Sequence, residues 1–159
     1  MHRPVAKDVF YTPAAVAKTH ISLLPHSATD LWLDPFRGKG AYYDHFPSEN
    51  KDWAEIEEDR DFFAYEGKPD IICSNPPYSM IDRVLEASVA LQPRIISYLL
   101  LHGALTPKRL EFINAAGYGL TGIYITKVYS WYGMTEAYTF ERGKENMAHV
   151  TYDRIVHRV

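Results

Sequence analysis

Residues 70–79 of the 159-residue chain read Asp-Ile-Ile-Cys-Ser-Asn-Pro-Pro-Tyr-Ser, and this stretch is the strongest indication of the fold class. Its first five residues form a short apolar run that predicts a buried strand of a parallel sheet. The two prolines that follow cannot continue a strand ladder or begin an ordinary helical turn, so they predict a rigid, extended loop. Open α/β sheets bind ligands at the carboxyl ends of their strands, which makes this loop the first candidate site.

The side chains of this loop suit a planar amine. Backbone carbonyls beside Pro76 and Pro77 are fixed acceptors, Asn75 adds a side-chain carbonyl, and Tyr78 offers a flat face for stacking. Such acceptors also stabilise the positive charge that a nitrogen gains as it attacks a methyl group. Asn-Pro-Pro occurs in ordinary turns too, but its position after a buried strand and before a helix favours a site.

Outward from this loop, strand-like runs alternate with helix-like segments, which predicts an α/β fold with a mostly parallel sheet and helices on both faces. The expected strands are 30–33, 52–56, 70–74 and 94–101, followed by an antiparallel pair, 120–131 and 137–142, and an edge strand, 148–159. The expected helices are one that Thr12 caps with Pro13 at its first position, and segments 41–46, 80–91 and 107–116.

Apolar spacing assigns the inward faces of two helices. The first helix is expected to bury Val16, His20, Leu23 and Leu24. The helix 80–91 is expected to bury Ile81, Val84, Leu85, Ser88 and Val89. Thr106 is expected to cap the helix 107–116, and Gly117 to end it.

A second candidate site is the loop Asp34-Pro35-Phe36-Arg37-Gly38-Lys39-Gly40-Ala41-Tyr42, which follows the first strand. Its two glycines let the backbone approach a ligand. The loop lacks the third glycine of the dinucleotide fingerprint and the Lys-Ser/Thr of a phosphate loop, which disfavours a pyrophosphate cofactor. Asp34 opens the loop and suits a cationic group, such as the amino group of S-adenosylmethionine.

A third signal follows the second strand. Glu55 can accept hydrogen bonds from both hydroxyls of a ribose. Asp61 can accept from an adenine amino group, and Phe62 can cover the ring. The acidic residues 57–59 are interpreted as a solvated turn.

Together these motifs resemble the amino-methyltransferases, specifically DNA N6-adenine methyltransferases in the gamma-like motif order. Residues 10–13 resemble the Phe-x-Thr-Pro cofactor motif of that family, and residues 34–42 its Asp-Pro-Phe-x-Gly-x-Gly-x-Phe loop. Residues 75–78 match its catalytic tetrapeptide, Glu55 its ribose-binding acid, and Asp61 and Phe62 its adenine-binding pair. The resemblance spans most of residues 9–142.

The resemblance implies a single Rossmann-like class I methyltransferase domain over residues 1–159, with S-adenosylmethionine as cofactor and N6 of adenine in DNA as acceptor. The implied catalytic residues are Asn75, Pro76, Pro77 and Tyr78. The implied cofactor-binding residues are Tyr11, Thr12, Pro13, Asp34, Pro35, Phe36, Gly38, Gly40, Glu55, Ile56, Asp61, Phe62 and Asn75. The implied substrate-binding residues are Tyr78, Ser79, Trp131, Tyr132 and Lys39.

Two departures from the family pattern stand out. Only six positions separate Glu55 from Asp61, where relatives insert a helix and a strand, so an open cofactor site is expected. Gamma-class relatives carry a target-recognition domain after the catalytic core, but only about seventeen residues follow Arg142 here, so that domain is expected to be absent. In this the chain resembles small phage-type enzymes. Sequence specificity is therefore expected from loops or from a partner subunit, or is low, and the exposed sheet edge leaves room for a homodimer.

The charge and the cysteine and histidine content limit which substrates, metals and disulfides are expected. The net charge of −3 predicts a local patch rather than a basic coat for nucleic acid, with Lys39, Arg37 and Lys127 as candidate phosphate contacts. A single cysteine, Cys73, excludes an internal disulfide and a cysteine-based zinc site, and the seven histidines lack ligand spacing, although His102 could lie near the site. No metal, no membrane span and a cytoplasmic location are expected.

Three alternatives remain open from the sequence. The same acceptors could hold N6 of adenine in RNA, or the side-chain amide of a glutamine in a protein. The chain could also be a non-catalytic, cofactor-binding subunit of a methyltransferase complex.

Overall fold

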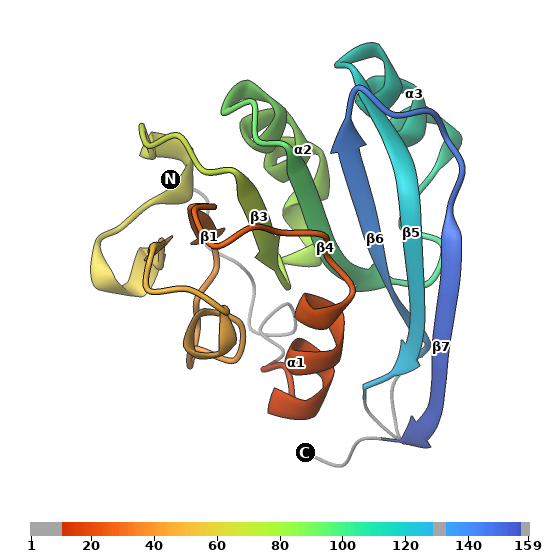
Figure 1. Ribbon diagram of the computed structural model, residues 1–159, viewed down its shortest axis with the longest axis horizontal. Coiled ribbons are helices and arrows are strands. Elements are labelled where there is room, and N and C mark those ends of the chain that lie inside the picture. Colours follow the sequence, from red (N-terminus) through yellow and green to blue (C-terminus); the bar gives the residue numbers. More distant parts are fainter. Residues whose placement is uncertain (1–10, 129–132, 157–159) are drawn as a thin grey trace.

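A seven-stranded sheet forms the centre of the molecule, in the order β2-β1-β3-β4-β6-β5-β7 (Figure 1). The computed structural model describes residues 11–128 and 133–156. The strands are β1 (Trp32–Asp34), β2 (Lys51–Trp53), β3 (Ile71–Ser74), β4 (Ile95–Leu101), β5 (Tyr118–Lys127), β6 (Thr135–Arg142) and β7 (His149–Val156). Strands β2, β1, β3 and β4 are parallel, whereas β6 runs antiparallel to β4 and β5.

Helices cover both faces of the sheet, as expected. Successive residues of β3 point to opposite faces, so Ile71 and Cys73 pack against α1 (Ala14–Ser22). Ile72 points to the other face and shares a core with α2 (Ile81–Ala90) and α3 (Pro107–Ala115). The expected α/β class and the buried strand before residue 75 are both confirmed.

The first helix starts one residue later than expected. Pro13 is the N-cap, with an extended ψ of 141°, and no side chain caps the helix, so the predicted capping by Thr12 is wrong. Leu23 lies beyond the last helical residue and is exposed, which corrects its assignment to the core. His20 is buried as expected, and its ring bonds the Tyr42 hydroxyl at 2.8 Å and Ser97 Oγ at 2.7 Å.

The other two helices follow the expected pattern closely. The 3-10 turn η5 (Tyr78–Met80) leads into α2, which buries Ile81, Val84, Leu85 and Ser88. Val89 is partly buried against the same core. Thr106 caps α3 by accepting a hydrogen bond from the Arg109 amide at 3.3 Å, and Gly117 follows its end with a φ of +94°.

Two expected elements near the glycine loop are shorter than the sequence indicated. The predicted helix 41–46 is only a 3-10 turn, η2 (Tyr43–His45), because Phe46 precedes Pro47 and is extended. The second strand ends at Trp53 instead of residue 56. Beyond it Glu55 forms an isolated bridge with Arg60, and the chain enters the 3-10 turn η3 (Ile56–Glu58).

The last three strands complete the far side of the sheet. Strands β5 and β6 form the expected antiparallel pair, and β7 lies at the edge as expected, parallel to β5. Among the described residues, no helix is both long and apolar enough for a membrane crossing.

Candidate active site

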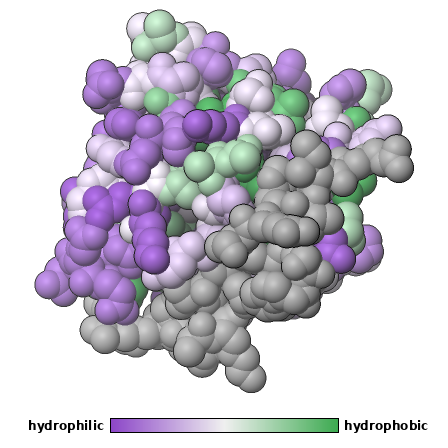
Figure 2. Space-filling model, turned by 90° about the horizontal axis from the view of Figure 1, so that it is seen from below, coloured by the Kyte–Doolittle hydropathy of each residue, from purple (hydrophilic) through white to green (hydrophobic). Residues whose placement is uncertain are grey.

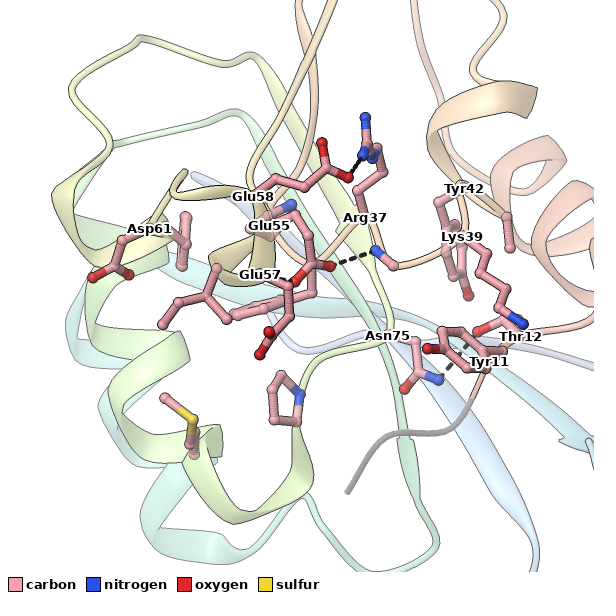
Figure 3. Close-up of a pocket in the computed structure, with 18 of the residues that line it drawn as sticks. Tyr11, Thr12, Arg37, Lys39, Tyr42, Glu55, Glu57, Glu58, Asp61 and Asn75 are labelled. Atoms are coloured by element: carbon pink, nitrogen blue, oxygen red, sulfur yellow. Dashed lines mark hydrogen bonds and ion pairs between the residues drawn. The ribbon is translucent and has the colours of Figure 1, made fainter. Parts of the chain in front are cut away.

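A cavity of about 310 Å³ opens beside the carboxyl ends of β1, β2 and β3 (Figure 3). Most of the expected cofactor-binding residues line it: Tyr11, Thr12, Pro35, Phe36, Gly38, Glu55, Ile56, Asp61, Phe62 and Asn75. Pro77 and Lys39 line it as well. The structure therefore brings residues from four separate sequence segments into one cavity.

The glycine loop wraps around one wall of this cavity. Gly38 and Gly40 have φ values of +53° and +90°, which glycine adopts readily. The Arg37 amide donates to the Ala54 carbonyl at 3.0 Å, and the Gly38 amide donates to Glu55 Oε2 at 2.8 Å. These bonds fix the loop against the segment that follows β2.

Asp34 lies beneath the loop and does not line the cavity. Its side chain is fully buried, and its oxygens accept hydrogen bonds from Ser74 Oγ at 2.6 Å and from the Phe36 and Tyr43 amides at 3.2 Å. Burial raises the pKa of this carboxyl to about 7. Asp34 thus joins β1, β3 and η2, and its oxygens contact donors of the protein itself. Pro13 and Gly40 do not line the cavity either.

Glu55 is the carboxylate that connects two segments of the cavity wall. Its Oε1 accepts from the Glu57 amide at 3.3 Å, while its Oε2 accepts from Gly38. Figure 3 shows the Glu55 side chain between the glycine loop and the acidic turn. A carboxylate in this position can serve as an acceptor for hydroxyl groups in the cavity.

An apolar slot occupies the far end of the cavity. The rings of Phe36 and Phe62 meet edge to face, with centroids 5.4 Å apart, and Phe63 lies beside them. Asp61 caps the 3-10 turn η4 (Phe62–Ala64) by accepting from the Phe63 amide at 3.0 Å. The slot can take a flat, apolar ring, and the carboxylate of Asp61 would lie at the edge of that ring.

The proline loop forms the opposite wall. Asn75 Nδ2 donates to Thr12 Oγ1 at 3.1 Å, and both residues line the cavity with Pro77. Pro76 is buried. Tyr78 is half-buried and packs against the core, whereas Ser79 is exposed, and neither residue lines the cavity.

Basic side chains at the rim already have partners within the protein. Arg37 pairs with Glu58, and its guanidinium lies 3.7 Å from the centroid of the Trp53 ring, with Arg60 also over that ring at 4.0 Å. Lys39 Nζ lies 4.4 Å from the centroid of the Tyr11 ring. Arg37 and Lys39 therefore shape the wall of the cavity as well as supplying positive charge.

The remaining candidates are Trp131, Tyr132, Lys127 and His102. Trp131 and Tyr132 fall outside the described residues. Lys127 ends β5 and does not line the cavity, and neither does His102, which is exposed and bonds Glu136 Oε1 at 2.6 Å. Within residues 11–128 and 133–156, no group of three or more His, Cys, Asp or Glu side chains could hold a metal ion.

Six lining residues were not among the predicted site residues: Ala41, Tyr42, Glu57, Glu58, Phe63 and Met80. Glu57 and Glu58 belong to the expected acidic turn and are exposed. Phe63 directly follows the expected adenine-binding pair, so the pair of phenylalanines was the available signal. Tyr42 ends the glycine motif, and its hydroxyl is held by His20. Met80 lies in the turn η5 and lines the cavity, and no sequence pattern predicted this turn.

Comparisons with known proteins bear on the fold. No family model matches the sequence, and no curated protein does. Among solved structures, a provisionally assigned RNA methyltransferase from Pyrococcus horikoshii is 16% identical, with a TM-score of 0.65, over 82% of this chain and 86% of its own. The precorrin-6y C5,15-methyltransferase of Geobacter metallireducens is 14% identical, with a TM-score of 0.58, over 88% of this chain and 94% of its own.

A third similar structure is the modification subunit of a provisionally assigned type I restriction enzyme from Vibrio vulnificus. It is 12% identical, with a TM-score of 0.64, over 91% of this chain. The match covers 47% of that subunit, so this chain spans about half of its length. At these identities the likeness concerns the fold, and the chain has the Rossmann-like fold of class I methyltransferases.

Proposed function

We propose that this chain is an S-adenosylmethionine-dependent methyltransferase that acts on N6 of adenine in DNA. One observation carries the proposal. The glycine loop, Glu55, the phenylalanine slot and Asn75 surround a single cavity at the carboxyl edge of a methyltransferase-type sheet. In this fold, that edge is where ligands bind.

The cavity fits the cofactor in size and in chemistry. Its volume of about 310 Å³ lies at the lower end of the usual range for small-molecule sites. The loop around Gly38 would hold the methionine end, Glu55 the ribose hydroxyls, and Asp61 with the slot at Phe62 the adenine. When bound, S-adenosylmethionine supplies a methyl group on a positively charged sulfur.

The proline loop supplies acceptors for the target amine. The side-chain oxygen of Asn75 and the carbonyl of Pro76 accept the two N6 hydrogens, and the Tyr78 ring stacks on the base. These acceptors stabilise the positive charge that develops on the nitrogen, and positioning contributes much of the acceleration. A target in duplex DNA must first be unstacked, at a cost of a few kcal/mol.

Adenine in RNA is the second candidate acceptor. It is supported by the similarity to the Pyrococcus protein, of which the match covers 86%. The similarity to the Vibrio modification subunit supports DNA, and also a partner subunit that recognises the target sequence. DNA ranks first because the order of the sequence motifs resembles DNA N6-adenine methyltransferases.

The test is transfer of a labelled methyl group. The protein is incubated with labelled cofactor and unmethylated DNA or RNA, and the product is digested to nucleosides. N6-methyl-2′-deoxyadenosine is expected from DNA, and Asn75→Ala should lower the rate about 100-fold or more, as for loss of a transition-state hydrogen bond. Asn50→Ala, at an exposed asparagine outside the cavity, is the matched control. Absence of methylated adenine with both substrates, or full activity of Asn75→Ala, would overturn the proposal.

A further inference from the structure

Thr12 contacts Asn75 across 63 positions of the sequence. The Asn75 Nδ2 amine donates to Thr12 Oγ1 at 3.1 Å. Thr12 does not cap α1, because Pro13 occupies the N-cap and no side chain caps that helix. Its hydroxyl is therefore directed at Asn75.

The position of Thr12 is fixed from both sides. Directly after it, α1 is anchored by Val16 and Ala17, which are fully buried. Directly before it, the Tyr11 ring lies under Lys39, and Gly38 is close enough that an added Cβ would meet that ring at 3.5 Å. The segment 11–12 thus contacts both the glycine loop and the proline loop, and these contacts hold the Thr12 hydroxyl beside Asn75.

The two ends of an asparagine amide have opposite hydrogen-bonding properties. The oxygen accepts, whereas the NH₂ group only donates. A half-turn of the amide would present a donor to an amine that is itself a donor. Because the NH₂ group of Asn75 faces Thr12, the side-chain oxygen points away from Thr12 (Figure 3), and this oxygen atom is buried.

We propose that Thr12 is a positioning residue that selects the orientation of the Asn75 amide and so keeps an acceptor facing the target nitrogen. The proposal rests on the proposed function, which assigns Asn75 to the amine. It gives Thr12 a role toward the methyl-accepting base in addition to its implied role toward the cofactor.

Replacement of Thr12 by valine keeps the branched shape and removes the acceptor. We expect Thr12→Val to lower kcat roughly tenfold or more, because the Asn75 oxygen is no longer held where it accepts a hydrogen bond in the transition state. KM for the cofactor should change little. Thr12→Ser, which keeps the hydroxyl, should restore most of the activity. Thr106→Val also removes a hydroxyl that bonds a protein N–H, at the cap of α3, and should leave kcat unchanged.

A double-mutant cycle separates orientation from general support. The carboxylate of Asn75→Asp has two equivalent oxygens, so its orientation does not matter. In that background Thr12→Val should cost less than threefold, far below its cost in the wild type. A Thr12→Val protein with wild-type kcat, or the same loss in both backgrounds, would contradict the proposal.

A measurement without turnover separates this inference from the proposed function. In the NMR spectrum of the wild-type protein, the Asn75 NH₂ protons should show a nuclear Overhauser effect to the Thr12 methyl group. In Thr12→Val, a second orientation of the amide should become populated. An NH₂ group that faces away from Thr12 in the wild type refutes the positioning role, whether or not the protein methylates adenine.

Discussion

At the scale of single residues, Glu55 joins two segments of the cavity wall. Its two oxygens accept from the amides of Gly38 and Glu57, two residues that both line the cavity. In the proposed complex the same carboxylate receives the ribose hydroxyls. Glu55 is therefore both a support of the wall and a proposed contact of the ligand.

We expect Glu55→Ala to weaken cofactor binding by roughly 10- to 100-fold, because hydrogen bonds to a charged group contribute about 1.5–3 kcal/mol. Isothermal titration calorimetry with S-adenosylmethionine measures the affinity. Glu86→Ala, at an exposed carboxylate of α2, is the control and should bind as the wild type does. An unchanged affinity of Glu55→Ala would remove Glu55 from the ribose site.

At the scale of elements, the segment between β6 and β7 crosses the start of β5. The Gly143 amide donates to the Gly117 carbonyl at 2.8 Å, and the Met147 amide to the Leu120 carbonyl at 2.9 Å. Gly119 leaves room for this crossing, since an added Cβ would lie 2.3 Å from the Lys144 carbonyl oxygen. The crossing returns the chain so that β7 runs parallel to β5.

Gly119→Ala should therefore destabilise the protein by about 2 kcal/mol or more, the usual range for overpacking against a backbone that cannot move freely. Gly122→Ala is the matched control in the same strand, because its Cβ would meet Thr139 side-chain atoms at 3.3 Å. We expect a smaller loss there, measured by chemical denaturation. Equal stability of the two variants would show that the crossing is not tightly packed.

The elements that the sequence predicts best are those with strong local signals. The apolar run before Asn75 and the Thr106 cap needed no tertiary information, and both are confirmed. The prediction of a helix over residues 41–46 was wrong, because the constraint that Pro47 places on Phe46 outweighs the helical pattern of the segment. The Thr12–Asn75 contact could not be predicted, since Thr12 is equally suited to capping the helix that follows it.

At the scale of the whole molecule, acidic residues gather on one side of the sheet. Residues 44–70 contain ten Asp and Glu against three Lys and Arg, although the chain as a whole has a net charge of −3. Figure 2 shows hydrophilic side chains over the side of the molecule that carries β2. Phosphates are repelled from this side, so we expect nucleic acid to approach the cavity from the other side.

Two buried titrating groups make the stability of the fold depend on pH in opposite directions. Asp34 has a folded pKa of about 7, above its ordinary value, so its neutral form is favoured and stability falls as pH rises from about 4 to 7. Burial lowers the pKa of His20 to about 3, so the unfolded chain binds more protons there and stability rises with pH up to about 6.5.

Comparison of the wild type with Asp34→Asn isolates the contribution of the Asp34 carboxyl to the pH dependence of stability. Relative to this variant, the wild type should lose at most about 4 kcal/mol of stability between pH 4 and pH 7.5, at about 1.4 kcal/mol per pKa unit. Chemical denaturation across that range measures the difference. Asp82→Asn changes an exposed carboxylate, and its stability should depend on pH as that of the wild type does. If the stability of Asp34→Asn changed with pH as that of the wild type does, Asp34 would be ionised over the whole pH range.

The most direct test of the account as a whole is a nucleoside analysis of nucleic acid from cells that express the protein. The host should lack adenine methylation of its own, and its DNA and RNA are digested separately. We predict N6-methyl-2′-deoxyadenosine in the DNA of cells that express the wild-type protein, and none above background with Asn75→Ala. No methylated adenine in either nucleic acid, or the same amount with both proteins, would contradict the assignment of residues 75–78 to adenine N6.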